Sequence, residues 1–122
     1  MTPDTVLGPC PVRDVLDRVG DKWSVLVISL LGAGPMRFTE LKRTIGVVSQ
    51  RMLTVTLRAL ERDGLVRRTV HPVVPPRVDY QLTDLGRSLH DILDQLAHWA
   101  FAHSDDVAAA RAAYDGLSRA TV

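Results

Sequence analysis

The sequence predicts a mainly α-helical fold that carries one small β-hairpin and a long helix near its C-terminal end. Three observations predict it. Apolar residues recur at helical spacing over most of the chain, two short segments separated by prolines have the composition of strands, and a heptad-like apolar stripe follows them. With 122 residues, of which 46% are hydrophobic and 24% charged, the chain is long and apolar enough for one domain with a buried core.

The first part of the chain predicts an arm and two helices. Residues 1–11 contain three prolines and are expected to form a flexible arm that holds the single cysteine, Cys10. A short amphipathic helix follows as far as Gly20, with apolar positions at Val12, Val15, Leu16 and Val19. Trp23–Leu31 is apolar on nearly all sides, as expected of a helix at the centre of a small bundle.

A short strand and a short helix are predicted next. Met36 and Arg37 are expected to form the strand. Thr39–Ile45 has apolar residues at helical spacing, with Thr39 placed as its cap and Gly46 as its end.

A second helix is predicted from a cap at Ser49 to about Asp63. Its buried stripe is Leu53, Leu57 and Leu60, and Gly64 ends it. At about 100° per residue, the outward face carries Arg51, Val55, Arg58 and Arg62, with Gln50 and Thr54 near the N-terminal end. Two helices joined by a tight turn, the second with a basic outer face, are typical of a helix-turn-helix, whose second helix enters the major groove of DNA.

The hairpin comes directly after these helices. Leu65–Val70 and Val78–Leu82 are predicted strands, and the proline-rich segment 71–77 between them is expected to project as a loop. A hairpin in this position is the wing of a winged helix-turn-helix. Its arginines are expected near the backbone or minor groove of the same duplex, and they are Arg67, Arg68 and Arg77.

The charges are distributed unevenly. The formal net charge is only +1, but residues 37–77 hold nine Arg and Lys against three acidic residues, a local +6, and the rest of the chain carries −5. Such a segment is expected of a phosphate-binding surface, and Arg suits phosphates and guanine edges. On charge alone, a solvated charged surface remains the alternative.

The last predicted helix begins after a cap at Thr83 and carries an apolar stripe about 20 residues long. Its members are Leu85, Leu89, Ile92, Leu96, Trp99 and His103. The excess apolar surface is expected to pack against a second copy of the chain, and packing along the chain's own first helices is the alternative. Residues 12–103 are thus predicted to form the winged domain with its dimerisation helices, and residues 104–122, capped at Ser104, a short helical tail that frays past Gly116.

These elements resemble the HxlR-type bacterial transcriptional regulators. The similarity covers roughly Cys10 to His103 and is most specific from SQRML at 49 through ERDGLV to PPRVDYQLT ending at 83. It departs from the family at His71, where an aromatic is common, and at Val47-Val48, which replace a more usual Gly-Ile pair. The resemblance implies a homodimer on a pseudo-palindromic operator, with Ser49–Asp63 as recognition helix and an interface built by the N-terminal and the long C-terminal helices. The interface residues are then Val12, Leu16, Leu89, Ile92, Leu96, Trp99 and His103.

Cys10 is a candidate redox sensor. It precedes a helix whose positive end, together with Arg13, would favour the thiolate. The resemblance implies that such an N-terminal cysteine responds to small electrophiles or oxidants. With one cysteine, the switch would be an intersubunit disulfide, a mixed disulfide or alkylation. A buried or merely exposed thiol is the alternative.

The remaining expectations concern function classes. DNA contacts are expected from Arg37, from Ser49, Gln50, Arg51, Thr54, Val55 and Arg58, and from the three wing arginines. No catalytic constellation or cofactor motif is recognisable. No metal site is expected either, because His90 and His98 lie about 12 Å apart along a helix, too far for one ion to bind both. We therefore expect a cytoplasmic regulator without a membrane span or enzymatic activity. A winged-helix protein-interaction module without specific DNA binding is the alternative.

Overall fold

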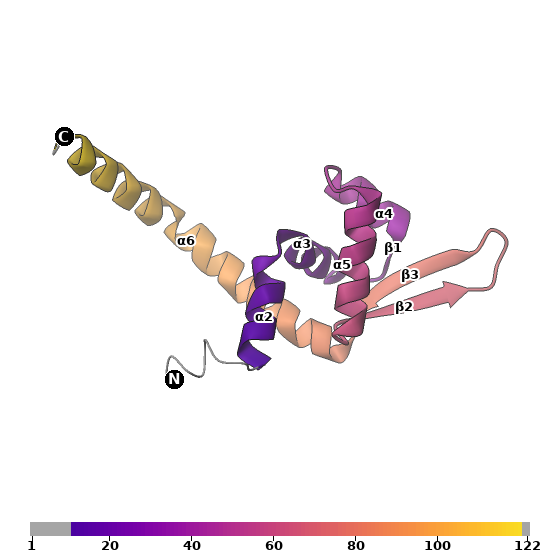
Figure 1. Ribbon diagram of the computed structural model, residues 1–122. Helices are drawn as coiled ribbons and strands as arrows, with labels where there is room; N and C mark the ends of the chain where they lie inside the picture. The colour runs from indigo at the N-terminus through magenta and orange to yellow at the C-terminus, as the bar shows by residue number, and fades with distance from the viewer. Residues whose placement is uncertain (1–10, 121–122) are drawn as a thin grey trace. The chain divides into compact units, whose positions relative to one another are not determined.

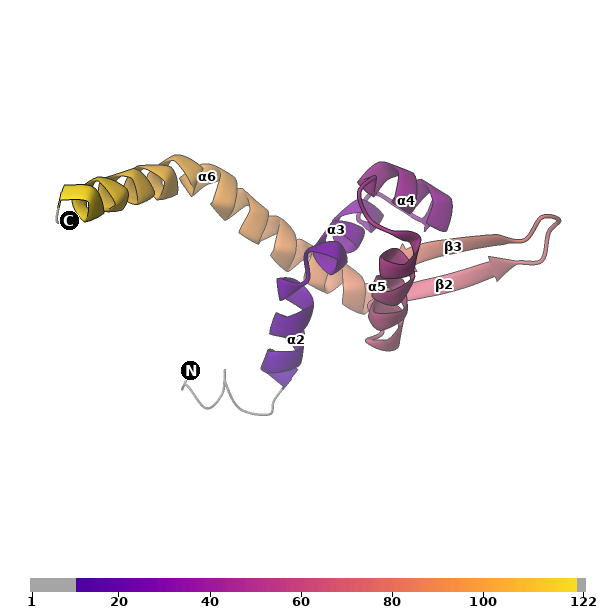
Figure 2. The same ribbon diagram turned by 45° about the horizontal axis from the view of Figure 1, so that its top comes forward.

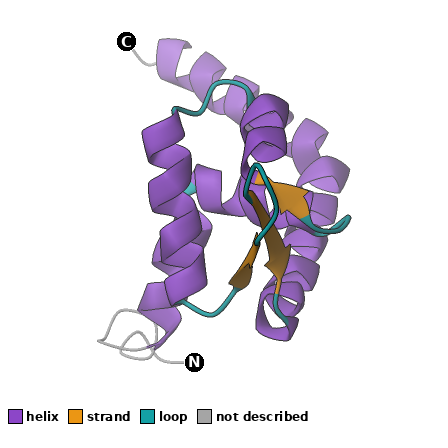
Figure 3. Ribbon diagram, turned by 90° about the vertical axis from the view of Figure 1, so that its right-hand side faces the viewer, coloured by secondary structure: helices purple, strands orange, loops and turns teal. Residues whose placement is uncertain are grey.

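The computed structural model describes residues 11–120. The elements in chain order are α2 (Pro11–Gly20), α3 (Lys22–Leu31), β1 (Met36–Arg37), α4 (Phe38–Ile45), α5 (Gln50–Arg62), β2 (Val66–His71), β3 (Arg77–Leu82) and α6 (Asp84–Ala120) (Figure 1). Helices dominate, and the strands are confined to one small sheet (Figure 3). The predicted mainly helical fold with a hairpin is confirmed. Among the described residues, those up to His90 form one compact unit, and the part of α6 from Asp91 onward forms a second.

The core of the first unit lies where α5, α3 and the sheet meet. The predicted stripe of α5 is buried, with Leu53 and Leu60 fully covered and Leu57 nearly so. Residues Val27, Ile28 and Leu31 of α3 are also buried, which confirms that α3 lies at the centre. Tyr80 and Leu82 of β3 complete this apolar layer. Helix α5 contacts both α3 and β2 (Figures 1 and 2).

The sheet has three antiparallel strands in the order β1-β3-β2. The predicted short strand β1 adds to the hairpin through the pairs Met36 with Tyr80 and Arg37 with Asp79. Between β2 and β3, Arg68 pairs with Tyr80, whereas Arg67 pairs with Gln81. Since successive side chains of a strand point to opposite faces, Arg67 and Arg68 lie on opposite faces of the sheet. Arg68 shares its face with the buried Tyr80, on the side of α5.

The predicted ends of α5 are confirmed, and the predicted start of α4 is not. Ser49 accepts a hydrogen bond from the backbone N–H of Met52 at 3.0 Å, and Gly64 has φ of 76°, as predicted for the two ends of α5. The predicted cap at Thr39 is wrong. Helix α4 begins one residue earlier, because the Glu40 carboxylate reaches back and accepts a hydrogen bond from the backbone N–H of Arg37 at 3.2 Å.

Strand β2 is shifted one residue toward the loop relative to the prediction, and β3 begins one residue earlier and still ends at Leu82. His71 and Arg77 still pair, so the strands extend to Val66–His71 and Arg77–Leu82. Leu65 lies outside β2 because its N–H donates to the carbonyl of Leu60 at 3.0 Å and closes the end of α5. The projecting loop is therefore limited to residues 72–76.

Helix α6 is anchored to the hairpin through its first turn. The N–H of Gly86 donates to Thr83 Oγ1 at 3.0 Å, which confirms the predicted cap. A Cβ at Gly86 would overlap the carbonyl oxygen of Leu65, so only glycine allows this approach. The predicted cap at Ser104 is wrong, because its hydroxyl donates to the carbonyl of Phe101 at 3.3 Å and α6 continues through it and past Gly116.

Much of the predicted apolar stripe of α6 is uncovered. The exposed fractions of Ile92, Leu96 and Trp99 are 61%, 54% and 56%. His103 is half-buried and stacks on Trp99, with ring centroids 4.6 Å apart. On α2, Val15 and Leu16 are also exposed. These two helices thus carry apolar side chains that the described chain does not bury.

Candidate DNA-binding surface

Helix α5 carries five of the ten residues predicted to contact DNA, and three of the five lie on its outward side. Arg51, Val55 and Arg58 are exposed, as expected from their positions opposite the buried leucines. Val55 is 53% exposed, so an apolar group lies among the cations on this face. The face is therefore able to offer guanidinium donors together with a methyl-bearing side chain to a groove of DNA.

One flank of α5 and the hairpin enclose a groove of about 440 Å³, here called the helix–wing groove. Its lining includes four predicted DNA contacts, Gln50, Thr54, Arg58 and Arg68. The three α5 residues lie at about 60°, 100° and 140° from Leu53, which is the flank turned toward the wing. The structure thus brings together residues of α5 and β2 that lie far apart in the sequence.

Two other predicted residues lie at a second groove, here called the tip groove. Arg37 and Arg77 line it together with the start of α4 and the wing loop, and its volume is about 460 Å³. In the sheet, Arg37 pairs with Asp79 and Arg77 pairs with His71, so their side chains share the face opposite Arg68. Arg37 is exposed and Arg77 is half-buried.

Arg67 does not join either set. It lines a smaller hollow of about 300 Å³ at the base of the wing, together with Gln81, Thr83 and Arg87. The sequence grouped Arg67 with Arg68 because both are arginines of one strand. The alternation of the strand separates them, and only Arg68 faces the recognition helix.

Two hydroxyl groups of this surface, at the cap and in the first two turns of α5, already have hydrogen-bond partners within the helix. Ser49 accepts the capping hydrogen bond from Met52, and Thr54 Oγ1 donates to the carbonyl of Gln50 at 2.8 Å. Each hydroxyl therefore retains only part of its hydrogen-bonding capacity for a ligand. Gln50 and the arginines are left as the principal donors of this surface.

Two cations that the prediction omitted lie beside the same surface. Lys42 and Arg43, in the last turn of α4, line a groove that also includes Gln50 at the start of α5. The count of positive charges over residues 37–77 included them, but no pattern singled them out. Their proximity to Gln50 makes them candidates for phosphate contacts.

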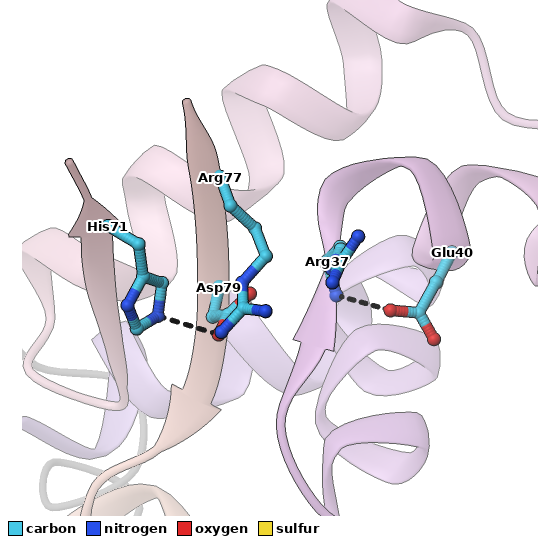
Figure 4. Close-up of polar contacts among 5 residues, drawn as sticks. All are labelled: Arg37, Glu40, His71, Arg77 and Asp79. Atoms are coloured by element: carbon cyan, nitrogen blue, oxygen red, sulfur yellow. Dashed lines mark hydrogen bonds and ion pairs between the residues drawn. The ribbon is translucent and has the colours of Figure 1, made fainter. Parts of the chain in front are cut away.

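The wing carries a polar cluster that the sequence did not predict. His71 Nε2 lies 2.8 Å from Asp79 Oδ2, and Arg77 Nη2 lies 3.4 Å from the same oxygen. Figure 4 shows these side chains side by side, with Arg37 on the neighbouring strand. His71 is thus joined to an arginine of the wing through one carboxylate.

The other predicted features are placed as follows. Cys10 lies outside the described residues, and α2 begins at the next residue, Pro11. Within residues 11–120, no three His, Cys, Asp or Glu side chains are grouped to hold a metal ion. Over the same residues, none of the helices combines the length and the hydropathy that a membrane crossing requires.

A helix-turn-helix whose second helix is basic on its outer side, followed by an arginine-bearing hairpin, defines a winged helix-turn-helix protein. Residues 18–107 match the model of the HxlR-like helix-turn-helix family, and the chain belongs to that family. It is a DNA-binding transcriptional regulator.

Relatives and solved structures agree with this assignment. The chain is 44% identical over 102 residues to the HTH-type transcriptional regulator YtfH of Escherichia coli K12, which covers 84% of this chain and 81% of the relative. The redox regulator HypR in its reduced form is similar in structure with a TM-score of 0.76 at 40% identity, over 82% of this chain and 99% of that one. The reduced form of the Bacillus subtilis transcriptional regulator YodB gives a TM-score of 0.68 at 37% identity, over 75% and 90% of the two chains.

The opposite placement of Arg67 and Arg68 gives a matched test. Arg68→Ala is expected to weaken binding to duplex DNA of any sequence alike, because it removes a positive charge beside α5 that is predicted to meet a phosphate. The slope of log affinity against log salt concentration should fall by about one. Arg67→Ala removes the same charge at the base of the wing, outside the helix–wing groove and the tip groove, and should leave that slope nearly unchanged. Equal losses of DNA affinity for the two variants in a fluorescence anisotropy titration would contradict the claim that only Arg68 belongs to the DNA-binding surface.

Proposed function

We propose that the protein binds a pseudo-palindromic operator as a homodimer, with the N-terminal part of α5 in the major groove and the wing at the adjacent backbone or minor groove. The observation that carries the proposal is the helix–wing groove, which gathers Gln50, Thr54, Arg58 and Arg68 from two elements. Arg51 and Val55 extend the same surface along the exposed side of α5. Arginine and glutamine at such positions suit the edges of guanine and adenine.

The position of each residue decides which part of the DNA we assign to it. Residues in the first two turns of α5 are assigned to base edges, because the N-terminal part of a recognition helix enters the groove most deeply. Arg68, with Arg37 and Arg77 at the tip groove, is assigned to the phosphate backbone or the minor groove. This role is that of a DNA-binding regulator rather than an enzyme.

The proposed dimer is supported by apolar side chains that remain uncovered. The stripe of Ile92, Leu96 and Trp99 is more than half exposed, and α2 presents Leu16 at 50% exposure. Helix α6 has 37 residues. Exposed leucine and tryptophan in a row on such a helix are typical of an interface between copies. Leu89 and His103 extend the stripe, and Val12 is assigned to the α2 part of the interface.

We also propose that Cys10 regulates DNA binding through oxidation or alkylation by a small electrophile or oxidant. The support is the structural likeness to HypR, a redox regulator, and the position of Cys10 next to the N-terminus of α2. A helix N-terminus favours the thiolate, which is the reactive form.

Specific recognition is tested on the DNA that flanks the protein's own gene. The wild type is expected to give a discrete complex in a mobility-shift assay at two salt concentrations. Arg51→Ala should lose about 1 to 3 kcal/mol of specific binding free energy. Arg62→Ala is the matched control, since Arg62 is exposed on the same helix but in its last turn. Absence of any salt-steep specific complex would favour a protein-interaction module instead.

The dimer is tested by sedimentation velocity. Leu96→Glu should raise the dissociation constant of the dimer at least about tenfold, because a carboxylate would be desolvated in an apolar interface. Gln95→Glu adds the same charge at the neighbouring exposed position and should leave the dimer intact. A wild-type monomer, or equal behaviour of the two variants, would overturn this interface.

The role of Cys10 is tested by treating the operator complex with diamide or a quinone. The wild type is expected to release DNA, and Cys10→Ser is expected to stay bound. Mass spectrometry of the treated wild type should show a disulfide, a mixed disulfide or an adduct at Cys10. Equal release by wild type and variant would eliminate Cys10 as the trigger.

A further inference from the structure

Asp79 is the one acidic residue between Gly64 and Thr83, the segment that forms the wing. It lies on β3, the middle strand of the sheet, where it pairs with Arg37 of β1 on one side and with Thr69 of β2 on the other. An acid on a surface that meets DNA repels phosphates, so its presence at this position requires a compensating role.

The contacts of Asp79 point to that role. Its Oδ2 lies 2.8 Å from His71 Nε2 and 3.4 Å from Arg77 Nη2 (Figure 4). Since a carboxylate only accepts, the histidine nitrogen donates in this hydrogen bond. His71 and Arg77 are paired across the hairpin, so the carboxylate joins the two strands at the point where the ladder ends and the loop begins.

The side chains of this cluster differ in how far they are buried. The Asp79 side chain is 23% exposed, whereas that of Arg77 is 41% exposed. The buried Arg77 Nε and Asp79 Oδ1 have no hydrogen-bonding partner in the described part of the chain. The guanidinium thus pairs with the carboxylate through Nη2, and because 41% of the Arg77 side chain is exposed it retains N–H donors for a further acceptor.

We propose that Asp79 is a positioning residue for DNA binding, which holds the Arg77 guanidinium in the orientation that meets a DNA phosphate at the tip groove. The inference rests on the proposed contact of the wing with DNA. A free arginine side chain loses conformational freedom when it binds, and an arginine already held by a carboxylate loses less. His71 fixes the carboxylate from the opposite strand.

Asp79→Asn tests the proposal by the sign of its effect. The substitution removes a negative charge near DNA, so electrostatics alone would tighten binding. If Asp79 positions Arg77, the substitution weakens binding instead. The affinity for the operator fragment is expected to fall about three- to tenfold, and the salt slope is expected to shrink by up to about one as the phosphate contact is lost.

A double-mutant cycle with Arg77→Ala shows whether the effect passes through Arg77. In that background Asp79→Asn should cause no further loss and should tighten binding slightly. A variant that merely misfolds would bind weakly in both backgrounds. Asp79→Glu keeps a carboxylate and is expected to recover most of the affinity. Asp105→Asn is the control, since it makes the same change at an exposed position of α6 that is in none of the surfaces assigned to DNA, and it should bind as tightly as the wild type.

Three results would overturn the proposal. They are wild-type or tighter binding by Asp79→Asn, an equal loss from Asp79→Asn with and without Arg77, and an Asp79→Glu variant as weak as Asp79→Asn. If Arg77→Ala binds like the wild type, the proposed contact of Arg77 with DNA is wrong. If the wild type gives no specific complex, the proposed function is wrong, whatever the Asp79 variants do.

Discussion

The burial of one apolar stripe of α5 determines which side chains the protein can present to DNA. Leu53, Leu57 and Leu60 are almost completely covered, and each contributes about 1.5 to 3 kcal/mol of hydrophobic stabilisation. Because a helix is rigid, fixing this stripe against α3 and the sheet also fixes the rotation of α5. The cations of its outer face and the flank that lines the helix–wing groove follow from that rotation.

Burial of one face of the sheet likewise determines which side chains of the wing face α5. Tyr80 and Leu82 are buried on the side of α5, so the residues that share their face are directed toward the recognition helix and the intervening residues away from it. This alternation places Arg68 beside α5 and leaves Arg67 on the other face. The local charge of +6 is therefore divided among several surfaces rather than gathered on one.

The sequence predicted the elements whose signals are local and periodic. The leucine stripe, the Ser49 cap and the left-handed Gly64 follow from helix geometry, and all three are confirmed. Thr39 failed as a cap because Glu40 competed for the same helix start, and Ser104 failed because a hydroxyl inside a helix can bond back to a carbonyl. Neither competition is decided by residue type alone.

The site was harder to predict than the fold because it depends on contacts between elements. The alternation of strand residues could have shown that Arg67 and Arg68 oppose each other, but only packing against α5 decides which one faces the recognition helix. The link from His71 through Asp79 to Arg77 depends on the hairpin register. That register could not be predicted from the sequence, because the proline-rich loop between the two strands does not fix how they pair. The apolar stripe of α6 was predicted by its spacing, and its exposure is what the structure adds.

The central claim is that α5 and the wing form one DNA-binding surface. Titration of the isotope-labelled protein with the operator duplex, followed by backbone amide NMR shifts, tests it most directly. We expect the largest changes in residues 50–58 and in the wing from Arg68 to Asp79, with little change in α6 from residue 91 to 117. Shifts concentrated in α6, with α5 and the wing unaffected, would contradict it.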